Sequence, residues 1–573
     1  MKFSFTVLVF SLLVAIITLL ENHVVIAFPT NTEILKGLGF VIHNTVSEKA
    51  VGAFEIKGTS GIAAMHVAVT ELNKIVIIDK VQSNPLKLPD GRRVVSLEYD
   101  ITDDSKRLLP LNTNTFCSAG SFMGDGTLVN LGGAEKKGSS YAAGYQGLRF
   151  FNPCTDKTCE WREDPKGLDA QRWYPTVITL NDGSLFIVGG SNQSTRVNTK
   201  IINMPTFEFF PKKAKQATTL QFLIDTLPYN LYPIVHLMPG PVGQNYLFIF
   251  ANRDSIIWDW KANKVVKKLP TIPGSPRSYP LTGTSVMLPL LPDDNYKPQV
   301  LICGGNSKDD VTNPAENSCG RIDLSNFDTA KWEMDDFGGI GRVMPDAVIL
   351  ADGKTLFLNG AGTGIAGYSR KKGDVLIPQA KDAILTSVIY DFRKPLGSRF
   401  SKNAKSTIPR YYHSVATLIP DGRVFVSGSS PQENVVDTGE FKTEFRIEYF
   451  SPDYVLQTKH PRGTIISVAG VTNVNVNPIP VKYNTNVAVI VEVTGSTVFS
   501  AALIHHGFVT HSVHMSQRYV GCLVKNVKLI ANGVFTMDVV MPPNHNMIAP
   551  GLSWLYVNNH GIPAKTAVHV MVS

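Results

Sequence analysis

Four side chains with redox or metal-binding chemistry, a thiol, two phenols and an imidazole, occupy matching places in a repeated sequence pattern. Cys117 and Tyr174 each lie eight residues before an Asp-Gly turn. The pattern returns further along the chain with Tyr412 and His413 at the matching place. If the repeats lie side by side, the four side chains converge. Imidazole and phenolate donors with an open position suit Cu(II), although spacing alone leaves zinc as an alternative.

The repeat itself predicts the architecture. It recurs about every 50–65 residues between residues 60 and 430, and seven copies can be read. Each copy is an apolar strand, a turn and a second apolar strand, which is typical of a β-hairpin. One hairpin cannot bury both of its faces, so the copies must stack. Radial stacking gives an all-β, seven-bladed kelch-type β-propeller, with a β-sandwich array or a solenoid as the alternative.

One repeat position should form a ring around the central channel, because the innermost strand of each blade runs beside that channel. The expected ring consists of His66, Cys117, Tyr174, Tyr232, Tyr279, Met344 and Tyr412. Aromatic and sulfur side chains can simply fill the mouth of the channel. The joint pattern favours a redox or metal site instead, since the second and third blades are neighbours and place Cys117 beside Tyr174.

The two ends of the chain differ from the repeats. Residues 1–27 carry one lysine, an apolar run and a small-residue site, which predicts a cleaved signal peptide rather than a signal anchor. Residues 28–458 are then the propeller. Residues 459–573 contain short alternating strands with regular turns, which predicts a C-terminal immunoglobulin-like β-sandwich.

The six cysteines fit a secreted protein, in which disulfides persist. Two pairs flank polar loops and are expected to form disulfides: Cys154 with Cys159, and Cys303 with Cys319. Cys117 and Cys522 could form a third, but we favour a chemical use for Cys117 and a lone buried thiol at Cys522. Secretion would also make Asn192, in Asn-Gln-Ser, a glycosylation acceptor.

The charge of the chain limits its partners. A net charge of +8 without any clustered basic stripe argues against nucleic acid as a partner. The same charge is compatible with a weak attraction to acidic polysaccharide or cell wall. We expect a monomer.

Four short motifs in this order identify a family. They are Phe-Cys-Ser-Ala-Gly at 116–120, Gln-Arg-Trp-Tyr-Pro-Thr at 171–176, Pro-Arg-Tyr-Tyr-His-Ser at 409–414 and Val-Thr-His-Ser-Val-His-Met-Ser-Gln-Arg at 509–518. With them, nearly the whole mature chain resembles the copper radical oxidases of the glyoxal oxidase and galactose oxidase family, more closely the glyoxal oxidase branch.

The resemblance implies a role for each motif residue. Tyr174, joined to Cys117 by a thioether, would hold a stable radical and bind one copper ion. His413 and His511 would be the other equatorial ligands, with His511 contributed by the C-terminal domain. Tyr412 would be the axial phenolate that accepts the substrate proton. Copper and radical together would remove two electrons from substrate and pass them to O2, which leaves as hydrogen peroxide.

The substrate is expected to be a small aldehyde such as glyoxal or methylglyoxal, oxidised to a carboxylic acid. Galactose oxidases carry an extra N-terminal carbohydrate-binding sandwich, for which this chain has no room, although galactose or another primary alcohol remains the alternative. A secreted kelch propeller that only binds glycans is a competing class. A glycoside hydrolase would need paired carboxylates near the channel, and the ring offers no convincing pair.

Further polar residues lie in or near these motifs. We expect several to shape the pocket or support the ligands, namely His66, Trp173, Arg410, Gln517 and Arg518. No family role can be transferred to His505, His506 and His514, for which surface or packing positions are the default expectation.

Overall fold

The computed structural model describes residues 52–70, 73–194, 197–372 and 375–573. Almost all regular elements in these residues are β-strands, as the apolar runs and turns predict. The predicted signal peptide, residues 1–27, lies outside the described residues. None of the helices in the described part of the chain is long and apolar enough to cross a membrane.

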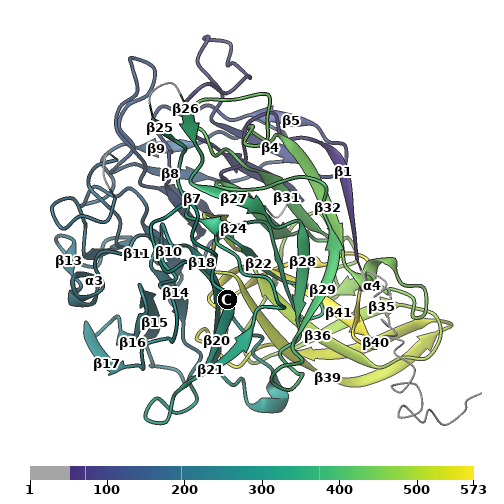
Figure 1. The fold of residues 1–573 in the computed structure, drawn as a ribbon. Coiled ribbons are helices and arrows are strands. Elements are labelled where there is room, and N and C mark those ends of the chain that lie inside the picture. The colour runs from purple at the N-terminus through teal and green to yellow at the C-terminus, as the bar shows by residue number, and fades with distance from the viewer. Residues whose placement is uncertain (1–51, 71–72, 195–196, 373–374) are drawn as a thin grey trace, which may run out of the picture. The chain divides into compact units, whose positions relative to one another are not determined.

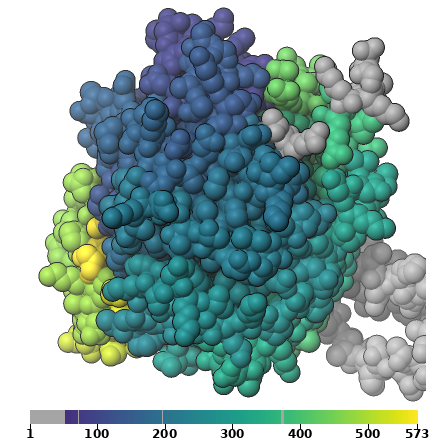
Figure 2. Space-filling view, turned by 90° about the vertical axis from the view of Figure 1, so that its left-hand side faces the viewer, coloured from purple at the N-terminus to yellow at the C-terminus, as the bar shows by residue number. Residues whose placement is uncertain are grey.

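Seven antiparallel sheets follow one another along the chain and confirm the seven-bladed β-propeller (Figure 1). In the space-filling view, the early and middle blades follow one another over one face in order of the colour bar (Figure 2). Blade 1 contains β2 (His66–Val69), β3 (Lys74–Ile78), β4 (Ser96–Asp100) and β5 (Lys106–Leu108); blade 2 contains β6 (Ala119–Phe122), β7 (Leu128–Leu131), β8 (Leu148–Phe151) and β9 (Arg162–Asp164). Blade 3 contains β10 (Thr176–Thr179), β11 (Leu185–Val188), β12 (Thr206–Phe210) and β13 (Thr218–Thr219); blade 4 contains β14 (Ile234–Leu237), β15 (Tyr246–Ala251), β16 (Asp254–Asp259) and β17 (Lys264–Lys268).

Among the last three blades, blade 6 contains an insertion and blade 7 closes the ring. Blade 5 contains β18 (Gly283–Met287), β19 (Gln299–Gly304), β20 (Ser318–Asp323) and β21 (Trp332–Asp336); blade 6 contains β22 (Asp346–Ile349), β23 (Thr355–Leu358), β28 (Thr386–Tyr390) and β29 (Phe400–Lys405); blade 7 contains β30 (Ser414–Leu418), β31 (Val424–Gly428) and β32 (Arg446–Ser451). Two hairpins are inserted in blade 6: β24 (Ala361–Gly364) with β27 (Ala380–Ala383), and β25 (Arg370–Lys372) with β26 (Val375–Ile377). The short helices are α3 (Gln221–Asp225), η1 (Pro292–Asp294) and α4 (Asp453–Leu456).

The outer strand of blade 7 comes from the other end of the propeller. It is β1 (Ala53–Thr59), which precedes blade 1 in the chain and pairs with β32. The first and last blades are thereby tied together by backbone hydrogen bonds. The repeat pattern did not reveal this strand, because β1 has no Asp-Gly turn and does not open a hairpin of its own.

The repeated sequence explains why each inner strand lies beside the channel. β6 (Ala-Gly-Ser-Phe) and β10 (Thr-Val-Ile-Thr) are fully buried, and apart from Phe122 they consist of small and β-branched residues. Each is followed by the predicted turn, in which Gly126 (φ 90°) and Gly183 (φ 80°) adopt left-handed backbone angles that favour glycine.

In several blades, a buried arginine lies two residues before the ring position and forms hydrogen bonds within its own blade. Arg172 donates to the carbonyl of Gly189 at 2.8 Å, and Arg410 donates to that of Gly428 at 2.5 Å. Arg172 also pairs with Glu208 at 2.8 Å. Because a buried charge is costly unless it is paired, these contacts fix the backbone that precedes each inner strand.

The C-terminal strands form the predicted β-sandwich. They follow the order β33 (Thr464–Val468), β35 (Asn486–Glu492), β40 (Val534–Val540), β39 (Arg518–Ala531), β36 (Phe499–His505), β41 (Gly551–Asn559), β43 (Val568–Val572) and β34 (Ile479–Val481), with β42 (Ile562–Pro563) beside β41. One end of β39 pairs with β36 and the other with β40, so this strand joins the two layers. Strand β32 of the propeller ends at Ser451 and β33 begins at Thr464, on either side of the expected boundary at 458.

Both expected disulfides are present. They join Cys154 to Cys159 and Cys303 to Cys319. Cys117 and Cys522 are free and buried, so they do not form the third disulfide that the sequence left open.

Candidate metal and radical centre

The ring residues reach the channel through an unusual backbone conformation. Cys117, Tyr174, Tyr232, Met344 and His413 all have φ between 46° and 65°, and each lies one or two residues before the innermost strand of its blade. A non-glycine residue in this region costs roughly 1–3 kcal/mol, so the surrounding fold must hold it. The amide of Tyr174 donates to the carbonyl of Cys117, and the amide of Tyr232 donates to that of Tyr174, both at 3.0 Å. Backbone hydrogen bonds therefore join the ring positions of successive blades.

Three phenols meet at the end of this channel. The hydroxyl of Tyr174 lies 2.7 Å from that of Tyr412 and 2.9 Å from that of Tyr279, and the last two lie 3.1 Å apart. All three side chains are buried. The structure thus brings Tyr174 and Tyr412 into direct contact, with the hydroxyl of Tyr279, another residue of the expected ring, within reach of both.

The thiol and two imidazoles complete the cluster. The Sγ of Cys117 lies 3.3 Å from Nε2 of His511, 3.9 Å from Nε2 of His413 and 3.9 Å from the hydroxyl of Tyr412. Ligand atoms of Cys117, His413 and His511 all lie within 4.8 Å of one another. This is the one such group of His, Cys, Asp or Glu side chains found among the described residues. All the residues proposed from the sequence for copper and radical chemistry are therefore brought together.

Hydrogen bonds leave the facing imidazole nitrogens free. Nδ1 of His413 donates to the carbonyl of Ser430 at 3.2 Å. Nδ1 of His511 lies 2.5 Å from Oγ1 of Thr510, which itself donates to the carbonyl of Met65. In both rings the proton therefore lies on Nδ1, and Nε2 keeps a lone pair directed at the cluster.

His511 is delivered by a hairpin that leaves the β-sandwich. Strands β37 (Phe508–Thr510) and β38 (Val513–Met515) join the sheet of blade 1, where Thr510 pairs with His66 of β2. The turn between them consists of His511 (φ 47°) and Ser512 (φ 67°). Two left-handed residues are typical of a type I′ hairpin turn, which usually takes Asn-Gly. His-Ser is not a sequence that favours this backbone conformation, which is consistent with a functional requirement for His511.

Burial sets the protonation of the cluster. It raises the pKa values of the Cys117 thiol and of the Tyr174 and Tyr412 phenols. It lowers the pKa values of the His413 and His511 imidazoles. Neutral imidazoles are ready ligands, whereas the phenols can ionise here only beside a compensating cation. The donor set of two imidazoles and two phenols therefore fits copper.

Aromatic rings surround the cluster. The ring centroid of Trp173, a motif residue expected to shape the pocket, lies 4.1 Å from that of Tyr174. Tyr368 packs edge-on against Tyr412 and His413, with ring centroids 5.6 and 5.3 Å apart. Tyr368 lies in the blade 6 insertion, outside the repeat, so no periodic signal pointed to it.

The remaining motif residues have structural contacts. His66 lies 3.1 Å from the carbonyl of Ile78 through Nδ1, and burial lowers its pKa to about 3. Gln517 accepts from the amide of Ile349 at 2.7 Å, and Arg518 donates to the carbonyl of Met547 at 2.7 Å.

The three histidines without a family role are packing residues. His505, His506 and His514 are buried. His505 ends β36 and His506 follows it, whereas His514 lies on β38, the second strand of the hairpin whose turn carries His511.

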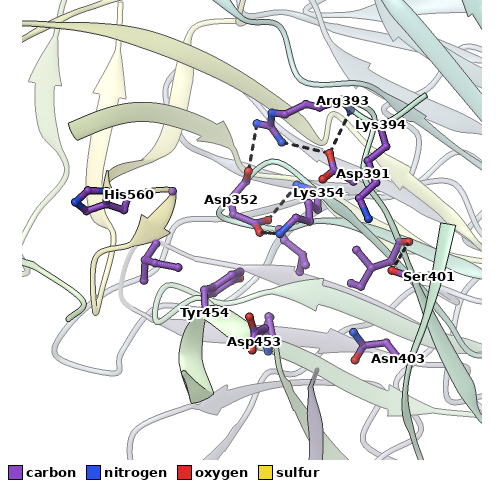
Figure 3. A pocket seen from close by; sticks show the side chains of 15 residues that line it. Asp352, Lys354, Asp391, Arg393, Lys394, Ser401, Asn403, Asp453, Tyr454 and His560 are labelled. Atoms are coloured by element: carbon purple, nitrogen blue, oxygen red, sulfur yellow. Dashed lines mark hydrogen bonds and ion pairs between the residues drawn. The ribbon is translucent and has the colours of Figure 1, made fainter. Parts of the chain in front are cut away.

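A separate cavity of about 590 Å³ lies between blade 6, α4 and the turn at His560 (Figure 3). Its charged side chains largely pair with one another: Lys354 lies 2.7 Å from Asp352, and Arg393 lies 3.7 Å from Asp391. None of its lining residues belongs to the cluster of phenols, imidazoles and thiol.

Comparison with known families covers most of the chain. The model described as glyoxal oxidase N-terminus matches residues 65–454. The chain belongs to the glyoxal oxidase family. The model described as galactose oxidase-like, early set domain, matches residues 470–572, which comprise the β-sandwich. Membership of this family of copper radical oxidases supports an oxidase that uses copper.

Curated relatives agree with this family. "Aldehyde oxidase GLOX" of Vitis pseudoreticulata is 33% identical over 88% of this chain and 94% of its own length. "Aldehyde oxidase GLOX1" of Arabidopsis thaliana is 33% identical over 88% of this chain and 82% of its own length. "Galactose oxidase" of Gibberella zeae is 23% identical over 78% of this chain and 59% of its own length.

A solved structure shares the fold. A fungal alcohol oxidase of the AA5 family, in complex with copper, superposes with a TM-score of 0.67 at 17% identity. The match covers 91% of this chain and 100% of that one. At this identity the likeness establishes the architecture of propeller and sandwich.

Proposed function

We propose that the protein is a secreted copper radical oxidase that converts small hydrated aldehydes, of the glyoxal or methylglyoxal type, to carboxylic acids. The hydrate loses two hydrogens to O2, so the products are one carboxylic acid and one hydrogen peroxide. The observation that carries this proposal is the contact among Tyr174, Tyr412, His413, His511 and Cys117 in one buried cluster. The relatives named aldehyde oxidase support the aldehyde as substrate.

The side chains divide the work. Nε2 of His413 and of His511, with the oxygens of Tyr174 and Tyr412, would hold one copper ion. Copper, when bound, supplies one of the two one-electron acceptors that the reaction needs, and the Tyr174 side chain supplies the other. A thioether from Cys117 to Tyr174 would extend the aromatic system over which the radical spreads, and burial excludes water from it.

Tyr412 would be the general base. Its oxygen lies 2.7 Å from that of Tyr174, so a substrate hydroxyl at the cluster lies within reach of both residues. The Tyr412 phenolate would take the proton of that hydroxyl, and the Tyr174 oxygen would take the hydrogen from carbon. Because Nε2 of His413 and of His511 would bind the copper, neither imidazole would compete with Tyr412 for the proton.

Secretion, monomeric state and loose association with cell wall or polysaccharide are parts of the same proposal. Secretion is supported by the signal peptide that the sequence predicts at residues 1–27, and the loose association is supported by the mild positive charge. The two disulfides suit an oxidising compartment. No nucleic-acid partner is expected.

Hydrogen peroxide release tests the proposal directly. Copper-loaded, oxidised protein is incubated with glyoxal, methylglyoxal, galactose and simple primary alcohols, and peroxide and carboxylic acid are measured together. We expect equal amounts of acid and peroxide from the aldehydes. Peroxide from galactose or alcohols alone would move the assignment to the alcohol-oxidising relatives. A lack of peroxide from every compound would favour a propeller that only binds glycans.

A further inference from the structure

Tyr368 is held rigidly at the cluster although it belongs to no blade. It lies between β24 and β25, and its ring stands nearly perpendicular to Tyr412 (83°) and His413 (86°). The ring of Phe116 is parallel to it, 2° apart in angle and 5.5 Å away. The ammonium of Lys80 forms another contact and lies 4.9 Å from the centroid of the Tyr368 ring. The orientation of Tyr368 is therefore fixed from several directions.

Lys80 is itself fixed. Its Nζ donates to Oγ of Ser430 at 2.8 Å and to the carbonyl of Gln432 at 2.6 Å. A buried, hydrogen-bonded ammonium against the Tyr368 ring adds a cation–π attraction that does not depend on the phenol hydroxyl. The hydroxyl therefore contributes nothing to how the ring is held.

The hydroxyl of Tyr368 has no hydrogen-bond partner in the described part of the chain, although the oxygen is buried. Burying an unpaired hydroxyl is unfavourable, so a phenylalanine would serve packing better at this place. Trp173, which also contacts Phe116, likewise has a buried Nε1 without a partner among the described residues. Two unpaired donors thus flank the phenols that are proposed to react.

Hydrated aldehydes need one more polar partner than alcohols do. The reacting carbon of the hydrate carries two hydroxyls, and that of a primary alcohol carries one. In the proposed function, Tyr412 takes the proton of the first hydroxyl. No residue so far assigned receives the second, which would be left unpaired in a site that excludes water.

We propose that the hydroxyl of Tyr368 hydrogen-bonds the second hydroxyl of the hydrated aldehyde and so makes the site prefer aldehydes to primary alcohols. This inference rests on the proposed function and names the residue that selects its substrate. Sites that offer a polar partner to a substrate hydroxyl discriminate against analogues that lack it.

The variant Tyr368→Phe tests the assignment. Its hydroxyl has no partner among the described residues, so the melting temperature should not fall, and the visible spectrum of the copper-loaded protein should stay as in wild type. We expect kcat/KM for aldehydes to fall about three- to tenfold, the worth of one neutral hydrogen bond, and kcat/KM for primary alcohols to be unchanged. Tyr145→Phe is the matched control, since its hydroxyl meets Ser194 and not the cluster. An equal loss for both substrate classes, or no loss, overturns the assignment.

A binding measurement with a compound that cannot be oxidised tests this inference independently of catalytic turnover. Hexafluoroacetone hydrate has two hydroxyls on one carbon but no hydrogen there, so it cannot be oxidised. Calorimetric titration of the copper-loaded protein should show about three- to tenfold weaker binding of this hydrate to Tyr368→Phe than to wild type. Hexafluoro-2-methyl-2-propanol, with one hydroxyl, should bind both equally. Equal binding of the hydrate to both proteins, or no binding to wild type, overturns the inference. A failure to produce peroxide would overturn the proposed function alone.

Discussion

The backbone amide of Tyr174 donates a hydrogen bond to the carbonyl of Cys117 at 3.0 Å. This bond joins two neighbouring blades at the position where both residues have left-handed backbone angles. Both side chains therefore leave the ring toward the same side, and the phenol and the thiol enter one buried space. The repeat therefore places the thiol of Cys117 and the oxidisable phenol ring of Tyr174 on neighbouring blades at the same position.

The first prediction is a covalent bond between these residues. Copper and O2 should oxidise the pair to a thioether, in which one carbon–sulfur bond forms and two hydrogens are lost with two electrons. After reduction of the two disulfides, the intact mass should be two hydrogens lighter than the mature sequence requires. Peptides that contain Cys117 and Tyr174 should stay joined after reduction.

Cys117→Ser is the control for the cross-link. It keeps the ring backbone and the size of the side chain but cannot form the thioether, so its two peptides should separate. If Cys117 of the copper-matured wild-type protein is alkylated like an ordinary thiol, the cross-link does not exist.

The second prediction concerns the hairpin that carries His511. His511→Ala should weaken copper binding about 10–100-fold and leave the propeller folded, because loss of a ligand or its support has effects of this size. Copper content by elemental analysis and far-ultraviolet circular dichroism check both parts. His560→Ala, a change at a partly exposed histidine far from the cluster, controls for adventitious copper. Unchanged copper content in His511→Ala would transfer the role to His514 or His506.

Sequence alone predicts those parts of the site that follow the repeat. The Asp-Gly turns fix the phase of Cys117 and Tyr174, and the motifs identify His413 and His511. Tyr368 could not be found, because it lies in an insertion whose length and path are not set by the repeat. Its packing on Phe116, more than 200 positions earlier in the chain, is a tertiary contact without a local signal.

The same limit applies to the fold. Seven blades follow from the period, but the pairing of β1 with β32 depends on where the ring closes. The pairing of Thr510 with His66 likewise depends on two domains that are far apart in sequence. Neither strand differs in composition from an ordinary edge strand, so hydrophobic pattern alone could not assign its partner.

The third prediction is a pH dependence of stability that arises at Asp346. Burial raises the pKa of this carboxyl to about 8, although Asn359 donates to it at 2.8 Å. The folded protein therefore binds the proton more tightly than the unfolded chain, whose carboxyl has a pKa near 4. This contribution favours folding at low pH and is lost as pH rises from about 4 through 8, by at most about 1.4 kcal/mol per pH unit.

Asp346→Asn should remove that dependence, because an amide does not ionise. Urea unfolding of copper-free protein at several values between pH 5 and 8 measures it. The free energy of unfolding of the variant relative to wild type should rise steadily with pH. A difference that stays constant over this range would show that Asp346 does not hold its proton in the folded protein.

The last prediction tests Tyr412 as the base. Tyr412→Phe removes one hydroxyl from a ring of nearly the same shape, and Tyr174, His413 and His511 remain to hold copper. General-base assistance is worth about 10²–10⁴-fold in rate, so peroxide release from aldehydes should fall by that factor while copper stays bound. Tyr411→Phe is the matched control: it is the adjacent residue, but its hydroxyl donates to Glu440 at 2.7 Å and lies outside the phenol cluster. Wild-type turnover in Tyr412→Phe, or an equal loss in both variants, would refute a proton-accepting role and leave Tyr412 as a packing residue.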